Sequence, residues 1–185
     1  MRAFIADAYD AKDHPISPAE YLDIVRNLYG ADTDAVLTQY PVGSFPTPSL
    51  TLATALTDQG RMLGACAQLP AATAAALRAP LYAYEFAQPA DAVINDFPLG
   101  AHHGADVPYF FDSNFPGPKP PPMTGAKRTF ADALTGYWTT FAHTGIPGPN
   151  WPAYDGATAL SLALDRTEPV DVAVEHRCEF WRSQD

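Results

Sequence analysis

The chain is poor in cysteine, because its 185 residues include only Cys66 and Cys178, too few for a scaffold built on disulfides. It also lacks long hydrophobic runs. No apolar stretch reaches the ~18–20 residues that a membrane-spanning helix needs, and no apolar segment at the N-terminus precedes a cleavage site. We therefore expect neither a membrane span nor a signal peptide.

Motifs for cofactors and metals are absent as well. The sequence contains no glycine-rich phosphate-binding loop, no cluster of histidines and cysteines at metal-ligand spacing and no internal repeat. We accordingly expect no cofactor and no metal ion.

Positive charge is scarce: 11 lysines and arginines stand against 21 aspartates and glutamates, for a formal net charge of −10. The acidic residues are dispersed, which disfavours a nucleic acid or an anionic membrane as the main partner. Apolar residues make up 47% of the chain, which is enough for a sizeable core. The 19 prolines are a high count, and many of them mark loops, which fits a loop-rich chain better than a compact bundle.

Local patterns predict a mainly helical chain with a few strands. Ser17, Pro18 and Glu20 form a capping box that begins a helix. We expect helices at 17–30, 32–40, 49–76 (with weak points at Gly60, Gly64 and Pro70), 124–143 and 171–182. We expect strands at 81–86 and at 159–164, the second of them near a sheet edge, and an extended proline-rich connector at 114–122.

The candidate functional residues are two adjacent histidines, His102 and His103. About ten residues, expected to form a loop, separate them from the apolar strand at 81–86. In α/β proteins, loops beyond the carboxyl ends of strands carry chemistry. Gly100 and Gly104 allow sharp turns on either side of the pair, and Asp106 is expected to cap a short helix. Taken alone, the pattern also fits a surface loop or a structural histidine.

This loop resembles the catalytic-histidine loop of the type B carboxylesterase/lipase family, which includes the cholinesterases. The matching residues are Gly100-Ala101-x-His103-Gly104-Ala105-Asp106-x-Pro108-Tyr109-x-Phe111. The family has an α/β-hydrolase fold and hydrolyses esters with a triad of Ser, Glu or Asp, and His. The resemblance implies that His103 is the triad base, whereas His102 falls on a variable position.

Two further segments resemble the same family. One is Tyr137-Trp138-Thr139-Thr140-Phe141-Ala142-His143-Thr144-Gly145-x-Pro147, followed by Asn150-Trp151-Pro152-x-Tyr154. We expect the aromatic residues of this segment to pack over the sheet, and we assign His143 no catalytic role. The other is Cys178-Glu179-Phe180-Trp181. In the cholinesterase branch such a cysteine pairs with one on the helix that here contains Cys66; two buried free thiols are the alternative.

The other parts of an esterase site are missing from the sequence. It contains neither a Gly-x-Ser-x-Gly nucleophile elbow nor a His-Gly-Gly-Gly-type oxyanion turn. In the family the serine and the acid precede the histidine, so this chain corresponds to the part after the acid. Asp7, Asp10 and Asp13 are poor substitutes for the acid, because no strand stands upstream to present them.

We therefore interpret residues 1–185 as a single partial domain of class α/β: the C-terminal portion of an α/β-hydrolase fold, mainly helices with a few strands of an incomplete sheet. The expected function is that of a carboxylesterase fragment that carries His103 and is inactive alone, since serine, acid and oxyanion hole are missing. The intact enzyme would act on a small-molecule ester. One alternative is a split esterase whose partner chain supplies the missing half; another is a non-catalytic, cholinesterase-like binding domain. The sequence does not indicate a cellular compartment.

Overall fold

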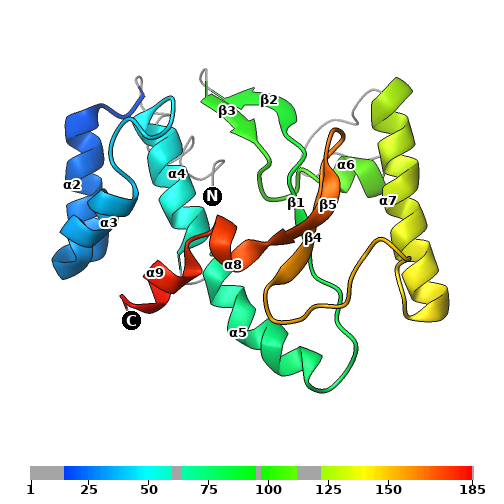
Figure 1. Ribbon diagram of the computed structural model, residues 1–185. Coiled ribbons are helices and arrows are strands. Elements are labelled where there is room, and N and C mark those ends of the chain that lie inside the picture. The colour runs from blue at the N-terminus through cyan, green and yellow to red at the C-terminus, as the bar shows by residue number, and fades with distance from the viewer. Residues whose placement is uncertain (1–14, 60–63, 95–96, 112–121, 185) are drawn as a thin grey trace. The chain divides into compact units, whose positions relative to one another are not determined.

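The computed structural model describes residues 15–59, 64–94, 97–111 and 122–184 (Figure 1). The chain divides into two compact units. The first comprises the described parts of Met1–Ala71, Ala90–His102 and Ala173–Asp185, and the second comprises those of Ala72–Pro89 and His103–Val172. The expected proline-rich connector, apart from Pro122, and the three aspartates near the N-terminus lie outside the described residues.

The first unit is built on helices whose ends follow from the sequence. Ser17 caps α2 (Pro18–Tyr29) and completes the capping box with Glu20, as predicted. A short 3-10 turn, η2 (Gly30–Asp32), leads into α3 (Thr33–Gln39), the second predicted helix. The fully buried side chains of this unit include Tyr21, Val25, Val36, Tyr40 and Leu52.

The stretch predicted as one helix at 49–76 forms two helices, α4 (Pro48–Asp58) and α5 (Ala65–Ala76). Gly60 lies outside the described residues, and Gly64 stands just before α5. The prediction of a weak point at Pro70 was wrong, because α5 continues through it. Proline removes one backbone hydrogen bond, and the alanine-rich sequence around it, with the highest helix propensity, offsets that loss.

A hairpin precedes the histidines where the sequence suggested a plain loop. Strands β2 (Ala90–Ile94) and β3 (Phe97–Gly100) pair in antiparallel fashion, with Ile94 opposite Phe97 and Ala90 opposite Gly100. The register shifts between Ala90 and Val93. This irregularity breaks the two-residue period by which a strand is recognised in a sequence, which explains the wrong prediction.

The second unit contains a three-stranded sheet with the order β1-β4-β5 (Figure 1). Strand β1 (Tyr84–Phe86) runs parallel to β4 (Thr158–Leu162), and β5 (Thr167–Asp171) runs antiparallel to β4. Both predicted strands are present, but β4 is the central strand and not near an edge. The error arose because β5 is exposed, polar and contains Pro169, so its sequence does not look like a strand.

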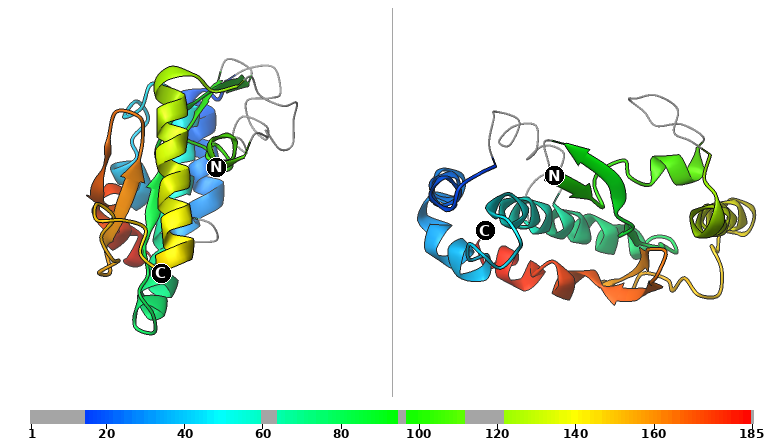
Figure 2. Two further views of the ribbon diagram at one scale, coloured as in Figure 1. Left: turned by 90° about the vertical axis from the view of Figure 1, so that its right-hand side faces the viewer. Right: turned by 90° about the horizontal axis from the view of Figure 1, so that it is seen from above.

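Two helices of the second unit accompany this sheet, α6 (Val107–Phe110) and the predicted long helix α7 (Gly125–Thr144). The helices lie beside one another (Figure 2). Phe130 and Leu134 of α7 pack with Leu160 and Leu162 of β4. Since side chains two residues apart along a strand share a face, α7 covers that face of the sheet.

The helix predicted at 171–182 is two short helices, α8 (Val172–Glu175) and α9 (Cys178–Arg182), and Asp171 still belongs to β5. Between them Arg177 has a left-handed backbone with φ of 54°, which an α-helix cannot contain. Among the described residues, no helix is both long and apolar enough to cross a membrane.

Candidate active-site loop and a buried carboxylate cluster

The histidine pair lies directly after β3, at the start of a turn that leads into α6. The side chain of His103 is exposed. His102 is half-buried, and its Nδ1 atom lies 3.1 Å from the carbonyl oxygen of Gly100. Gly104 has a backbone φ of +83°, a conformation that residues with a Cβ atom rarely adopt. The predicted sharp turn at Gly104 is therefore present.

Helix α6 holds this loop in place through its aromatic side chains. The N–H of Val107 donates to the carbonyl oxygen of Gly104 over 3.1 Å. The ring centroid of Tyr109 lies 5.3 Å from that of Phe86 and 5.4 Å from that of Phe130. The loop backbone next to His103 is thus tied to a helix that is packed against both β1 and α7.

Asp106 stands at the N-cap position of α6, as predicted, but its side chain makes no capping hydrogen bond. Its backbone carbonyl accepts the N–H of Tyr109 over 2.9 Å instead. The carboxylate influences Tyr84: burial and, after it, the negative charge of Asp106 raise the pKa of the Tyr84 phenol.

Histidine is the side chain that most often acts as a general acid or base in catalysis. Of the residues that the structure describes, none forms a hydrogen bond with the His103 imidazole. They also contain no group of three or more His, Cys, Asp or Glu side chains suited to holding a metal ion. The described residues therefore place no second member of a triad beside His103, and the catalytic role of His103 stays a prediction.

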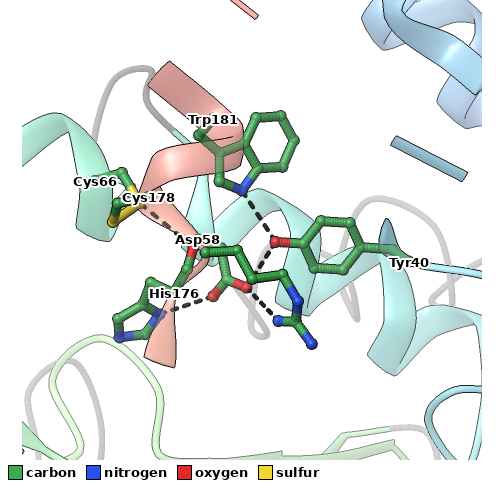
Figure 3. The surroundings of a disulfide bond; sticks show 7 residues. Tyr40, Asp58, Cys66, His176, Cys178 and Trp181 are labelled. Carbon is green, nitrogen blue, oxygen red and sulfur yellow. Dashed lines mark hydrogen bonds and ion pairs between the residues drawn. A yellow bond between two sulfur atoms is a disulfide. The ribbon is translucent and has the colours of Figure 1, made fainter. Parts of the chain in front are cut away.

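A second cluster of polar side chains surrounds Asp58, whose side chain is only 3% exposed (Figure 3). The Tyr40 hydroxyl donates to Asp58 Oδ2 over 2.8 Å, and Arg177 Nη1 donates to the same oxygen over 3.1 Å. His176 Nδ1 lies 2.7 Å from Asp58 Oδ1. The indole N–H of Trp181 in turn donates to the Tyr40 hydroxyl over 2.9 Å.

This cluster anchors the end of the chain to α4. The Arg177 guanidinium also lies 4.8 Å from the centre of the Tyr40 ring, a cation–π contact. Desolvation by burial, together with the charge of Asp58, raises the pKa of Tyr40. Because a buried carboxylate is stable only when it is paired and hydrogen-bonded, we interpret these contacts as structural.

Next to this cluster, Cys66 and Cys178 form a disulfide bond (Figure 3). It joins α5 to α9 with 5.2 Å between the two Cα atoms. Of the two alternatives left open by the sequence, the pairing implied by the family resemblance is confirmed. The two free thiols are excluded.

Sequence reasoning missed the roles of Tyr40, His176 and Arg177. One signal was available: Asp58 ends a helix whose other residues are mostly apolar, so a partner for its charge was to be expected. The partner could not be identified, because Arg177 lies 119 residues away in the sequence.

The second unit also contains an aromatic pocket of about 120 Å³. The aromatic side chains that line this pocket are Tyr82, Tyr84, Tyr137, Trp138, Phe141 and Trp151. The indole N–H of Trp151 donates to the backbone carbonyl oxygen of Ala83 over 2.9 Å. The segment around Trp151 therefore packs against the start of β1, which agrees with the packing role predicted for it. Tyr84 and Phe141 remain 44% and 45% exposed.

A comparison with protein-family models matches residues 47–181 to the carboxylesterase family. The chain belongs to the carboxylesterase family. The match begins at Thr47, the N-cap of α4, and includes the His103 loop, both cysteines of the disulfide and every residue of the Asp58 cluster except Tyr40. The family predicted from the sequence is thus confirmed.

The bile salt-activated lipase of Bos taurus is 35% identical to this chain over 80 residues. The alignment covers 40% of the chain but only 13% of the lipase. The chain thus aligns with only a small part of that lipase. Its mixture of helices and a small sheet is consistent with part of an α/β fold.

Proposed function

We propose that this chain is the histidine-bearing C-terminal part of a serine carboxylesterase with an α/β-hydrolase fold, and that His103 is its general base. The observation that carries the proposal is the position of His103. It is exposed on a loop that α6 ties to β1 and α7, and it lies within the segment that matches the carboxylesterase family.

In the proposed reaction the His103 imidazole takes the proton from a serine hydroxyl as the serine oxygen attacks the ester carbonyl. The protonated imidazole then gives that proton to the departing alcohol, which leaves an acyl-serine. In the second half, His103 takes a proton from water, the hydroxide attacks the acyl carbonyl, and the serine recovers its proton. The substrate class is a small carboxylic ester.

The serine, the acid and the oxyanion hole must come from outside the 185 residues, because no Gly-x-Ser-x-Gly elbow occurs in the sequence. When triad members act as a unit, removal of the nucleophile eliminates the covalent route. The proposal therefore includes inactivity of the isolated chain. Either a preceding segment of the same protein or a separate chain could supply the missing groups.

A serine-reactive fluorophosphonate probe tests this proposal. The chain is co-expressed with the nucleophile segment, defined as the polypeptide encoded directly upstream in the same genome that contains Gly-x-Ser-x-Gly. We expect fast labelling of the elbow serine with wild-type chain, and labelling at least 100-fold slower with His103→Ala. His102→Ala is the matched control and should label at the wild-type rate. Equal labelling with His103→Ala would contradict the proposal, as would an upstream sequence without the elbow.

A non-catalytic binding domain is the second candidate. It is favoured by the absence, among the described residues, of a serine or carboxylate bonded to His103. This candidate requires the isolated chain to be monomeric and to unfold cooperatively without any partner. Aggregation of the purified chain, or a requirement for the nucleophile segment to keep it soluble, would contradict this candidate.

A further inference from the structure

Helix α6 is too short to be stable through its own hydrogen bonds. It has four residues, whereas an isolated helix shorter than about 12–15 residues is barely stable in water. A hydrogen bond from the N–H of Phe111 to the carbonyl oxygen of Val107, over 2.9 Å, closes its one turn. The helical conformation of α6 must therefore be held by contacts with other elements of the second unit.

Two consecutive aromatic side chains of α6 make such contacts. The Tyr109 ring lies 5.3 Å from that of Phe86 on β1 and 5.4 Å from that of Phe130 on α7. The Phe110 ring lies 4.6 Å from that of Trp138, which is also on α7. Aromatic pairs whose ring centres are about 4.5–7 Å apart stabilise a fold beyond the area that they bury. Helix α6 is thus bound to the sheet and to α7.

These contacts fix the orientation of α6 as well as its place. Phe130 and Trp138 are eight residues apart on α7, which corresponds to about 12 Å along the helix axis. A segment that is held at two well-separated points cannot turn freely about either of them. Tyr109 is the stronger of the two anchors, because its ring contacts both β1 and α7.

The turn that carries His103 is joined directly to this helix, because only three residues stand between His103 and α6. The N–H of Val107, the first residue of α6, donates to the carbonyl oxygen of Gly104 over 3.1 Å. Ala105, in the middle of the turn, is only 5% exposed. Any shift of α6 therefore moves the backbone next to His103.

We infer that Tyr109 is a positioning residue for His103: its ring, held by Phe86 and Phe130, fixes α6 and through it the imidazole that takes the serine proton. This inference rests on the proposed function. A general base must lie within hydrogen-bond reach of the proton that it removes, and a misplacement of about 1 Å can cost about 100-fold in rate. When α6 is loosened, His103 spends less time in the productive position, so turnover falls while binding of the ester does not change.

Hydrogen exchange of the 185-residue chain is the first test. With Tyr109→Leu we expect the Val107 amide to exchange at least tenfold faster than in wild type, because its hydrogen bond to Gly104 opens when α6 loosens. The amide of Leu134, a buried residue of α7, should keep its wild-type rate.

A second variant, Phe86→Leu, removes one of the two partner rings and keeps Tyr109. It should raise the exchange rate of the Val107 amide at least threefold and leave that of Leu134 unchanged. Unchanged Val107 exchange in both variants would overturn the inference. Faster Leu134 exchange in both variants would overturn it too, because the rings would then stabilise the whole unit and not α6 in particular.

Turnover of p-nitrophenyl butyrate by the complex with the nucleophile segment is the second test. Tyr109→Leu should lower kcat at least tenfold and leave KM within about twofold of wild type. Tyr109→Phe keeps the ring and should restore kcat to within about threefold of wild type.

Tyr137→Leu is the matched control for this substitution. The Tyr137 ring makes an edge-to-face contact with Trp151 at 5.4 Å, the same separation as between Tyr109 and Phe130. The control should leave kcat unchanged, because Trp151 lies outside α6 and the His103 turn. A raised KM with unchanged kcat for Tyr109→Leu, or equal losses of kcat for Tyr109→Leu and Tyr137→Leu, would overturn the inference.

His103→Ala separates this inference from the proposed function. Turnover that does not need His103, or a wild-type complex without turnover, would refute the proposed function. Exchange of the Val107 amide would then still decide whether Tyr109 holds the turn. Turnover that needs His103 but is unaffected by Tyr109→Leu would overturn the inference and leave the proposed function supported.

Discussion

Replacing Asp58 by alanine should strongly destabilise the first unit. The carboxylate is 3% exposed and holds three partners at 2.7 to 3.1 Å. Removal of one member of a buried ion pair costs about 3–5 kcal/mol, because the remaining charge loses its compensation. Arg177 is 37% exposed and can still reach water, whereas the more buried Tyr40 hydroxyl cannot do so as easily. We therefore expect a loss of about 4 kcal/mol.

Urea unfolding followed by far-UV circular dichroism measures this loss, and the chain offers a matched control. Asp132 pairs with Arg128 at 2.6 Å, but both side chains are more than half exposed, at 58% and 65%. Exposed pairs one helical turn apart contribute only about 0.3–0.5 kcal/mol. Asp132→Ala should therefore change the free energy of unfolding by less than about 1 kcal/mol.

The comparison contrasts a buried carboxylate held by three partners with an exposed carboxylate that pairs with Arg128 on its own helix. A loss of under about 1 kcal/mol for Asp58→Ala, or equal losses at the two sites, would refute the reasoning that the Asp58 cluster anchors the chain's end. An Arg177→Met variant removes the cation of the pair and keeps the carboxylate. It leaves Asp58 buried beside Tyr40 and His176 and should also cost more than the Asp132 control.

Two further predictions concern redox state and pH. The Cys66–Cys178 disulfide closes a loop with a sequence separation of 112, so reduction should lower the free energy of unfolding by about 5 kcal/mol in the chain-entropy model, measured with and without dithiothreitol. Burial raises the pKa of Tyr21 from 10.0 to about 12. Below pH ~10 the neutral phenol makes its full contribution to the free energy of unfolding. This contribution falls by about 3 kcal/mol as the pH rises from about 10 through 12, because the unfolded chain loses the phenol proton first. Tyr21→Phe should abolish that part of the decline in urea titrations; an unchanged decline would contradict the assignment.

Local signals predicted the helices α2, α3 and α7 well. The capping box at Ser17 and Glu20 lies within a few residues of the helix that it begins, so short-range chemistry determines that boundary. The same holds for α7, which ends at Gly145 in a left-handed conformation. Such elements can be predicted because all the interactions that define their ends are close in sequence.

Two of the errors concern interactions between distant residues. The central position of β4 depends on β5, which has no typical strand pattern, and the break before α9 reflects the attachment of Arg177 to Asp58, 119 residues earlier. For the candidate site, a short motif sufficed to single out His103, since the glycine at the following turn and α6 lie next to it in sequence. The groups that would complete a triad cannot be read from these 185 residues.

Hydrolysis of p-nitrophenyl butyrate shows whether His103 is the base of an esterase site whose nucleophile lies outside this chain. The assay compares the isolated chain, its complex with the nucleophile segment, and complexes made with His103→Ala or His102→Ala. We expect turnover only in the complex, loss of turnover with His103→Ala and retention of turnover with His102→Ala. Turnover by the isolated chain that depends on His103 and exceeds that of free imidazole would contradict it, because a nucleophile would then lie within the chain itself.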